Sequence, residues 1–119
     1  MAAICIRILD GELIQDKHAA SAVEAIDFGD FDELELVIRV TAAGVAADGA
    51  PAAVTLVLQH APTADADALL DFPTAISVDL TTAGSTWIHV PYFTRWIFWF
   101  TTGQLASGAT VTVDIVARH

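Results

Sequence analysis

The chain has 119 residues, with 15 Asp and Glu against 5 Lys and Arg, and a formal charge of −10. This length fits one domain over 1–119, and 55% hydrophobic residues exclude a disordered acidic chain. Nucleic acid is not an expected partner, because phosphate binding needs clustered Lys and Arg. The most apolar run, 96–100, is far shorter than the about 20 residues of a membrane-spanning helix. We therefore expect a soluble protein, made in a cytoplasm, with no membrane partner.

Period-two alternation of apolar and polar residues recurs along the chain and predicts β-strands. The expected strands, in chain order, are 4–8, 23–28, 33–41, 53–60, 75–80, 86–90, 94–102 and 110–117. No segment of 12 or more residues has a helical period. The pattern therefore predicts an all-β, antiparallel β-sandwich of about eight strands, jelly-roll-like in its arrangement. The early part could include an N-terminal arm, because nothing in 1–52 assigns it a role.

Turn-forming residues separate the expected strands. The segment 42–52, with Gly44, Gly49 and Pro51, is predicted to be a loop, and so is 61–74, with one short helical turn near 66–70. Two shorter pieces, 83–85 and 103–108, are predicted to be hairpin connections.

The segment 24–35 holds six acidic residues and no basic one. Asp27, Asp30 and Asp32 could supply the oxygen ligands that a hard cation such as Ca²⁺ prefers. Their spacing does not match an EF-hand loop, in which ligands alternate around a glycine at position six. We therefore expect a solvated acidic loop, with no metal and no cofactor.

The residues that most often carry catalysis form no known pattern in this sequence. His18, His60, His89 and His119 are scattered, without the close pair that zinc sites use. Cys5 lies inside an expected strand, where a thiol is ordinarily buried and inert. The sequence contains neither a Gly-x-Ser-x-Gly elbow nor a Gly-rich phosphate loop. The protein is accordingly not expected to be an enzyme, and no catalytic residue is assigned.

The stretch 92–100 is the most distinctive of the chain, because both faces of the strand it predicts are apolar. One face can fill the core of a sandwich, which leaves the other for a partner. The two faces are Trp96, Phe98 and Phe100 on one side, and Arg95, Ile97 and Trp99 on the other.

We expect Arg95, Ile97 and Trp99 to form the outward face, with Tyr92 at its rim. Apolar and aromatic side chains beside an Arg are typical of protein interfaces. Two other interpretations stay open. The second face could be covered by the protein's own loops, or Trp87, Tyr92 and Trp99 could form a platform for stacking sugars.

Three segments, in a fixed order, carry a resemblance. A strand at 53–61 ends in Leu58-Gln59-His60 before an acidic loop, the aromatic segment 92–96 contains Phe93-Thr94-Arg95, and an alternating Val/Thr strand occupies 109–116. This order resembles the small β-sandwich structural proteins of tailed bacteriophages, found among capsid decoration (cement) proteins and other virion components. The resemblance covers 53–117.

The resemblance implies a virion protein without catalysis, made in the host cytoplasm and located on the capsid surface. Many copies, as trimers or dimers, would bind the lattice of the major capsid protein or another virion protein. A charge of −10 suits this role, because it disfavours adhesion to DNA. The alternatives are a phage tail or head–tail component, and a carbohydrate- or ligand-binding sandwich module.

Overall fold

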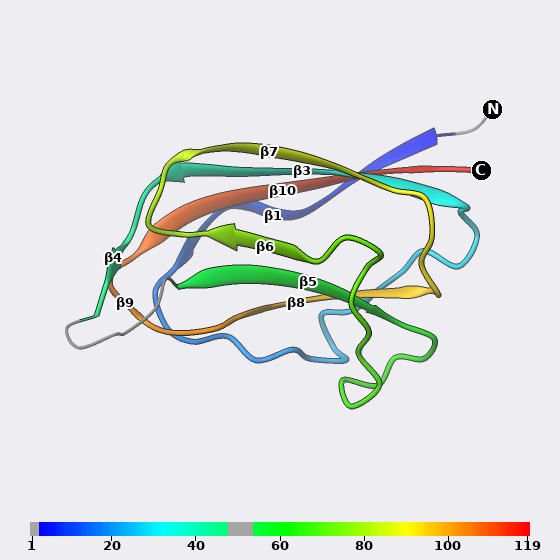
Figure 1. The fold of residues 1–119 in the computed structure, drawn as a ribbon, viewed down its shortest axis with the longest axis horizontal. Helices are drawn as coiled ribbons and strands as arrows, with labels where there is room; N and C mark the ends of the chain where they lie inside the picture. The colour runs from blue at the N-terminus through cyan, green and yellow to red at the C-terminus, as the bar shows by residue number, and fades with distance from the viewer. Residues whose placement is uncertain (1–2, 48–53) are drawn as a thin grey trace.

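The computed structural model describes residues 3–47 and 54–119, which form ten strands and no helix (Figure 1). The strands are β1 (Ala3–Ile14), β2 (Ile26–Asp27), β3 (Glu33–Ala42), β4 (Val45–Ala46), β5 (Thr55–Ala61), β6 (Ile76–Asp79), β7 (Gly84–Val90), β8 (Trp96–Thr101), β9 (Leu105–Ser107) and β10 (Ala109–Arg118). Sheet A has the order β1-β10-β3-β7, sheet B has the order β2-β8-β5-β6, and β4 pairs with β9. Within the described ranges, no helix is present that could cross a membrane.

The strands pair in a nested way, the first with the last. β1 pairs with β10, β2 with β8, β3 with β7 and β5 with β6, and every pair is antiparallel. This is the arrangement of a jelly roll, a long hairpin rolled into two facing sheets. The predicted all-β sandwich is therefore confirmed. The short strands β4 and β9 come in addition to the expected set.

Alternation explains which side chains form the core between the sheets. Along β10, Val113 and Ile115 are fully buried, whereas Thr112 and Asp114 are partly exposed. β3 alternates in the same way and places Leu36 opposite Ile115. Burying each such aliphatic side chain contributes about 1.5–3 kcal/mol to folding. The outer sides of both strands remain polar because they face solvent.

Several local predictions differ from the structure. The segments 83–85 and 103–108 are not hairpin turns. Residues 84–85 begin β7, which follows β6 across from sheet B to sheet A, and 103–108 contains β9 on the way from β8 in sheet B to β10 in sheet A. The loop at 61–74 contains a turn, closed by Ala68 N–H donating to the Asp65 carbonyl, but no helix. Of the expected loop 42–52, residues 45–46 form β4, and residues 48–52 lie outside the described residues.

The N-terminal segment contributes a full strand to sheet A. Residues 3–14, left open as an arm by the sequence, form β1 and pair with β10 from Ala3 to Ile14. Cys5 was expected to be buried but is exposed, because the register places it with the outward-facing Val116. The two described ends of the chain consequently lie at the same end of the sandwich (Figure 1).

Candidate functional site

β8 turns its two apolar faces the opposite way from the prediction. Ile97 and Trp99 are only 3% and 9% exposed and belong to the core, so they do not form an outward face. The pairing with β5 explains this orientation, because Trp99 lies opposite the buried Leu58. Alternation alone could not decide the orientation, since a strand that is apolar on both sides gives no sign of which side faces the core.

The outward side of β8 is partly covered by the chain itself. It consists of Trp96, Phe98 and Phe100, of which Phe98 is 1% exposed and the other two are half-buried. Residues 18–27 run along the free edge of β8, and at one end Ile26 pairs with Ile97. The interpretation that the protein's own loops cover this face therefore holds for Phe98, whereas Trp96 and Phe100 are only half-buried.

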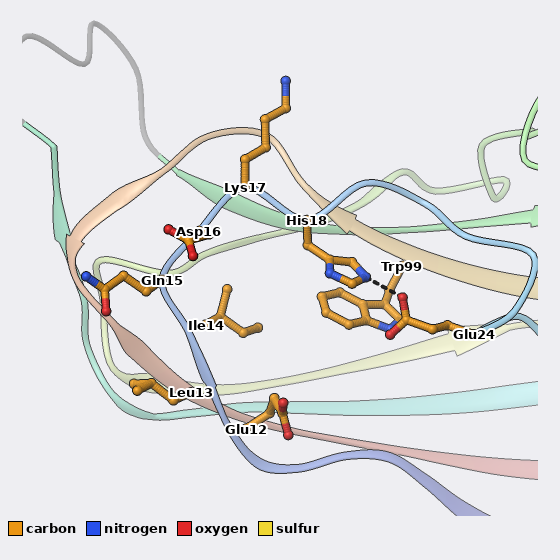
Figure 2. A pocket seen from close by; sticks show the side chains of 9 residues that line it. All are labelled: Glu12, Leu13, Ile14, Gln15, Asp16, Lys17, His18, Glu24 and Trp99. Carbon is orange, nitrogen blue, oxygen red and sulfur yellow. Dashed lines mark hydrogen bonds and ion pairs between the residues drawn. The ribbon is translucent and has the colours of Figure 1, made fainter.

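At the other end of this segment, His18 lies over Trp99 (Figure 2). The two rings are parallel within 3°, with centroids 3.8 Å apart. His18 Nε2 lies 2.6 Å from Glu24 Oε1, and the His18 backbone N–H donates to Thr101 Oγ1 at 2.7 Å. Thr101 N–H donates in return to the His18 carbonyl at 2.9 Å. These contacts fix the imidazole as a cover over the open edge of the sandwich.

A hollow of about 270 Å³ lies beside this stack. Its described lining includes three carboxylates, from Glu12, Asp16 and Glu24, but no hydroxyl or thiol that the imidazole could activate as a nucleophile. The His18–Glu24 pair has the geometry in which a carboxylate orients an imidazole. The sequence did not reveal this cluster, because no spacing pattern links residues 18, 24 and 99.

Asp27 is bound by Arg95 rather than free to hold a cation. Arg95 Nη2 donates to Asp27 Oδ2 at 2.8 Å, and Arg95 Nε donates to Oδ1 at 2.9 Å. The Arg95 hydrogen bonds, followed by one from Gly29 N–H, hold the pKa of Asp27 below its ordinary value. A Cβ at Gly29 would lie 2.8 Å from Arg95 Nε, so a larger residue there would displace the Arg95 side chain.

Asp27, Asp30 and Asp32, which the sequence offered as possible cation ligands, therefore do not form a cation site. In the part of the chain that the structure describes, no group of three or more His, Cys, Asp or Glu side chains could hold a metal ion. Arg95, by contrast, does lie at the surface, as the sequence led us to expect, although its guanidinium is committed to Asp27.

His60 joins two loops at one end of sheet B. Thr94 N–H donates to His60 Nδ1 at 3.0 Å, and His60 Nε2 lies 3.1 Å from the Asp71 carbonyl oxygen. A backbone N–H can only donate and a carbonyl can only accept, so the imidazole is neutral with its proton on Nε2. Gln59 Nε2 adds a hydrogen bond to Asp71 Oδ1 at 2.9 Å. We call this group of Gln59, His60, Asp71 and Thr94 the loop clasp.

Tyr92 stands at the rim of a second hollow, of about 320 Å³, next to the loop clasp. It is 73% exposed, as expected for a rim residue. Pro73, Phe93 and the buried His60 also line the hollow. An exposed tyrosine beside an apolar hollow is a common feature of protein interfaces.

The three rings considered as a sugar platform are not all exposed. Trp99 is closed off beneath His18, whereas Trp87 is 69% exposed and Tyr92 is 73% exposed. Trp87 lies on the outward side of β7, because its neighbours Ile88 and Val90 alternate with it and Val90 is buried. That outward position could be predicted from the alternation in 86–90, whereas the stacking of Trp99 could not.

Comparison with known proteins does not assign the chain to a family. No protein-family model matches the sequence, and no curated protein matches it either.

Proposed function

We propose that this chain is a non-enzymatic structural protein of a tailed-phage particle, with decoration of the major capsid protein lattice as its leading role. The observation that carries the proposal is the loop clasp. The two most informative pieces of the resemblance, Leu58-Gln59-His60 and Phe93-Thr94-Arg95, lie far apart in sequence. They meet where His60 Nδ1 accepts from Thr94 N–H at 3.0 Å.

The contact between these two segments holds the loops on either side in one conformation. The clasp ties residues 60–71 to the loop before β8, through both backbone and side-chain hydrogen bonds. Beside it, Tyr92 is exposed and its hollow is preformed. A preformed contact loses less conformational entropy when it binds, and many copies on a lattice add their individual contacts.

The surface that we assign to the virion partner therefore comprises Tyr92, the adjoining hollow and Arg95. Tyr92 supplies apolar area with a hydroxyl, and Arg95 presents a guanidinium already aligned by Asp27. Tyr and Arg are the side chains that most often dominate binding energy at interfaces. Ile97 and Trp99 have no part in this surface because they are buried.

The test is made on particles released by cells that carry the genome encoding this chain. We expect mass spectrometry to find the protein in purified particles, and electron microscopy to locate it on the capsid. Particles from a deletion strain should bind the purified protein, with about tenfold weaker affinity for Tyr92→Ser, as for loss of an interface anchor. Val23→Ser, which removes a side chain that is 94% exposed elsewhere, is the matched control and should bind normally.

Absence of the protein from particles would overturn the proposal. Location on the tail would replace capsid decoration by the tail or head–tail role. Equal weakening by Tyr92→Ser and Val23→Ser would leave the virion role in place but remove the Tyr92 surface from it.

A further inference from the structure

The outward side of sheet A differs in charge from the rest of the molecule. It carries three arginines, Arg7, Arg39 and Arg118, and four carboxylates, Glu33, Glu35, Asp114 and the Asp10 that is ion-paired with Arg7. The other described residues hold ten acidic and two basic side chains. The outward residues form rows across the sheet: Arg118 with Glu33; Cys5 with Val116, Glu35 and His89; Arg7 with Asp114, Val37 and Trp87; Thr112 with Arg39 and Ser85.

Most of these charges are paired within the face. Arg7 Nε donates to Asp114 Oδ1 at 2.8 Å, and Arg118 Nη1 lies 2.8 Å from Glu35 Oε1. Arg39 is exposed and has no ion-pair partner among the described residues. The face is therefore nearly neutral, with four carboxylates against three arginines, and Arg39 is available to a carboxylate from outside.

An apolar centre accompanies this nearly neutral charge pattern. Trp87 is 69% exposed in the same row as the half-buried Val37, and Val116 lies in the next row. A tryptophan this exposed, surrounded by charged residues, resembles the centre and rim of a protein interface.

We propose that this face binds a second copy of the same chain. Two molecules of charge −10 repel each other over most of their surfaces, but much less where both faces are nearly neutral. The face is also self-complementary. Along β3 the outward residues change from acidic to basic, from Glu33 and Glu35 through Val37 to Arg39.

A two-fold axis that runs parallel to the row of Val37 and Trp87, between the two facing sheets, makes the match explicit. It sets Trp87 against its counterpart in the second copy and reverses β3, so that Arg39 of each copy faces Glu35 of the other. The same surface is used twice, as in any two-fold dimer. The dimer thus gains an apolar contact and two reciprocal ion pairs. Arg7 and Asp114, which lie in the same row as Trp87, face their own counterparts but neutralise each other within each copy.

The size of the face predicts a weak dimer. Four strands about 4.8 Å apart and about seven residues long give a footprint of roughly 19 by 24 Å. This footprint is smaller than the roughly 800 Å² per partner of a standard interface. We accordingly expect a dissociation constant in the micromolar range or weaker.

The inference deepens the proposed function by naming the surface through which copies meet, and it is tested on purified protein without particles. Sedimentation equilibrium would be run on the full chain over a wide concentration range, in a Cys5→Ser background that excludes disulfide-linked dimers. Arg39→Glu and Glu35→Arg should each weaken self-association by about tenfold or more, because each sets like charges against each other. Trp87→Ser should also weaken it, and Val23→Ser should not.

Mixing the two charge variants gives the decisive result. An equimolar mixture of Arg39→Glu and Glu35→Arg should associate as wild type does, because the mixed dimer contains one ion pair of reversed sign and one native pair of Arg39 with Glu35. A merely misfolded variant would not be rescued in this way. Wild-type protein that stays monomeric at all concentrations, or Arg39→Glu protein that associates as wild type does, would overturn the inference. Neither outcome would alter whether the protein occurs in particles.

Discussion

The two outward faces of this sandwich obey the same alternation but have different chemistry. On sheet A, charged side chains pair across β1, β10 and β3, and Trp87 stands 69% exposed among them. On sheet B, the outward side of β8 is aromatic, and Phe98 is only 1% exposed. The chain therefore covers part of one outward face by itself and leaves the other open. The difference shows that an apolar outward side chain does not by itself mark an interface.

The largest effect should come from Phe98→Ala, which tests whether the outward face of β8 is covered. Removing a fully buried phenylalanine lowers the free energy of unfolding by about 3–5 kcal/mol. Urea unfolding followed by circular dichroism would measure the change. Phe100→Ala, at a half-buried position of the same face, should cost clearly less. Equal losses at the two positions would contradict the covering of Phe98.

His18→Ala should have an intermediate effect, because it removes the ring that covers Trp99 at the edge of sheet B. A stacked aromatic pair contributes about 0.5–1.5 kcal/mol beyond its buried area. Unfolding curves would give the loss, and a red shift of tryptophan emission would report the exposure of Trp99. Lys17→Ala is the control, since the Lys17 side chain points away from the stack (Figure 2). An unchanged emission spectrum would show that His18 does not shield the indole.

On sheet A, the paired charges should make a smaller contribution that depends on pH. Hydrogen bonds from Arg7 lower the pKa of Asp114, so the unfolded chain takes up a proton more readily than the folded one. The stabilisation is complete above the ordinary carboxyl value near pH 4 and is lost as the pH falls through the folded-state value. Asp114→Asn should therefore flatten the acid limb of a stability–pH curve. Asp67→Asn, in an exposed loop, should leave that limb unchanged.

The smallest effect on stability should come from Trp87→Ser in dilute protein. An exposed side chain away from the core changes the free energy of unfolding by about 0.5 kcal/mol or less. The same urea experiment would measure it, and its contrast with Phe98→Ala is the direct comparison of the two faces. A loss as large as that for Phe98 would mean that Trp87 packs within the monomer.

The alternation in the sequence predicted most strands, because a period of two depends only on local geometry. In β10 each buried valine is followed by a polar residue, which fixes both the strand and its inward side. In β8 both sides are apolar, so the orientation of Trp99 depends on its pairing with Leu58, a contact between distant segments. The sequence led us to expect exposed Tyr92 and Arg95, but the His18–Glu24–Trp99 cluster needs three segments that only the folded chain brings together.

The nested pairing of strands also sets an order for folding. The β5–β6 pair encloses the shortest connection, and each further pair, β3–β7, β2–β8 and β1–β10, encloses a longer one. Longer closures cost more entropy and slow the search for contacts. The last described strand in chain order, β10, is central in sheet A, between β1 and β3. Sheet A therefore cannot be completed on the ribosome before β10 has emerged, so folding of this sheet follows its synthesis.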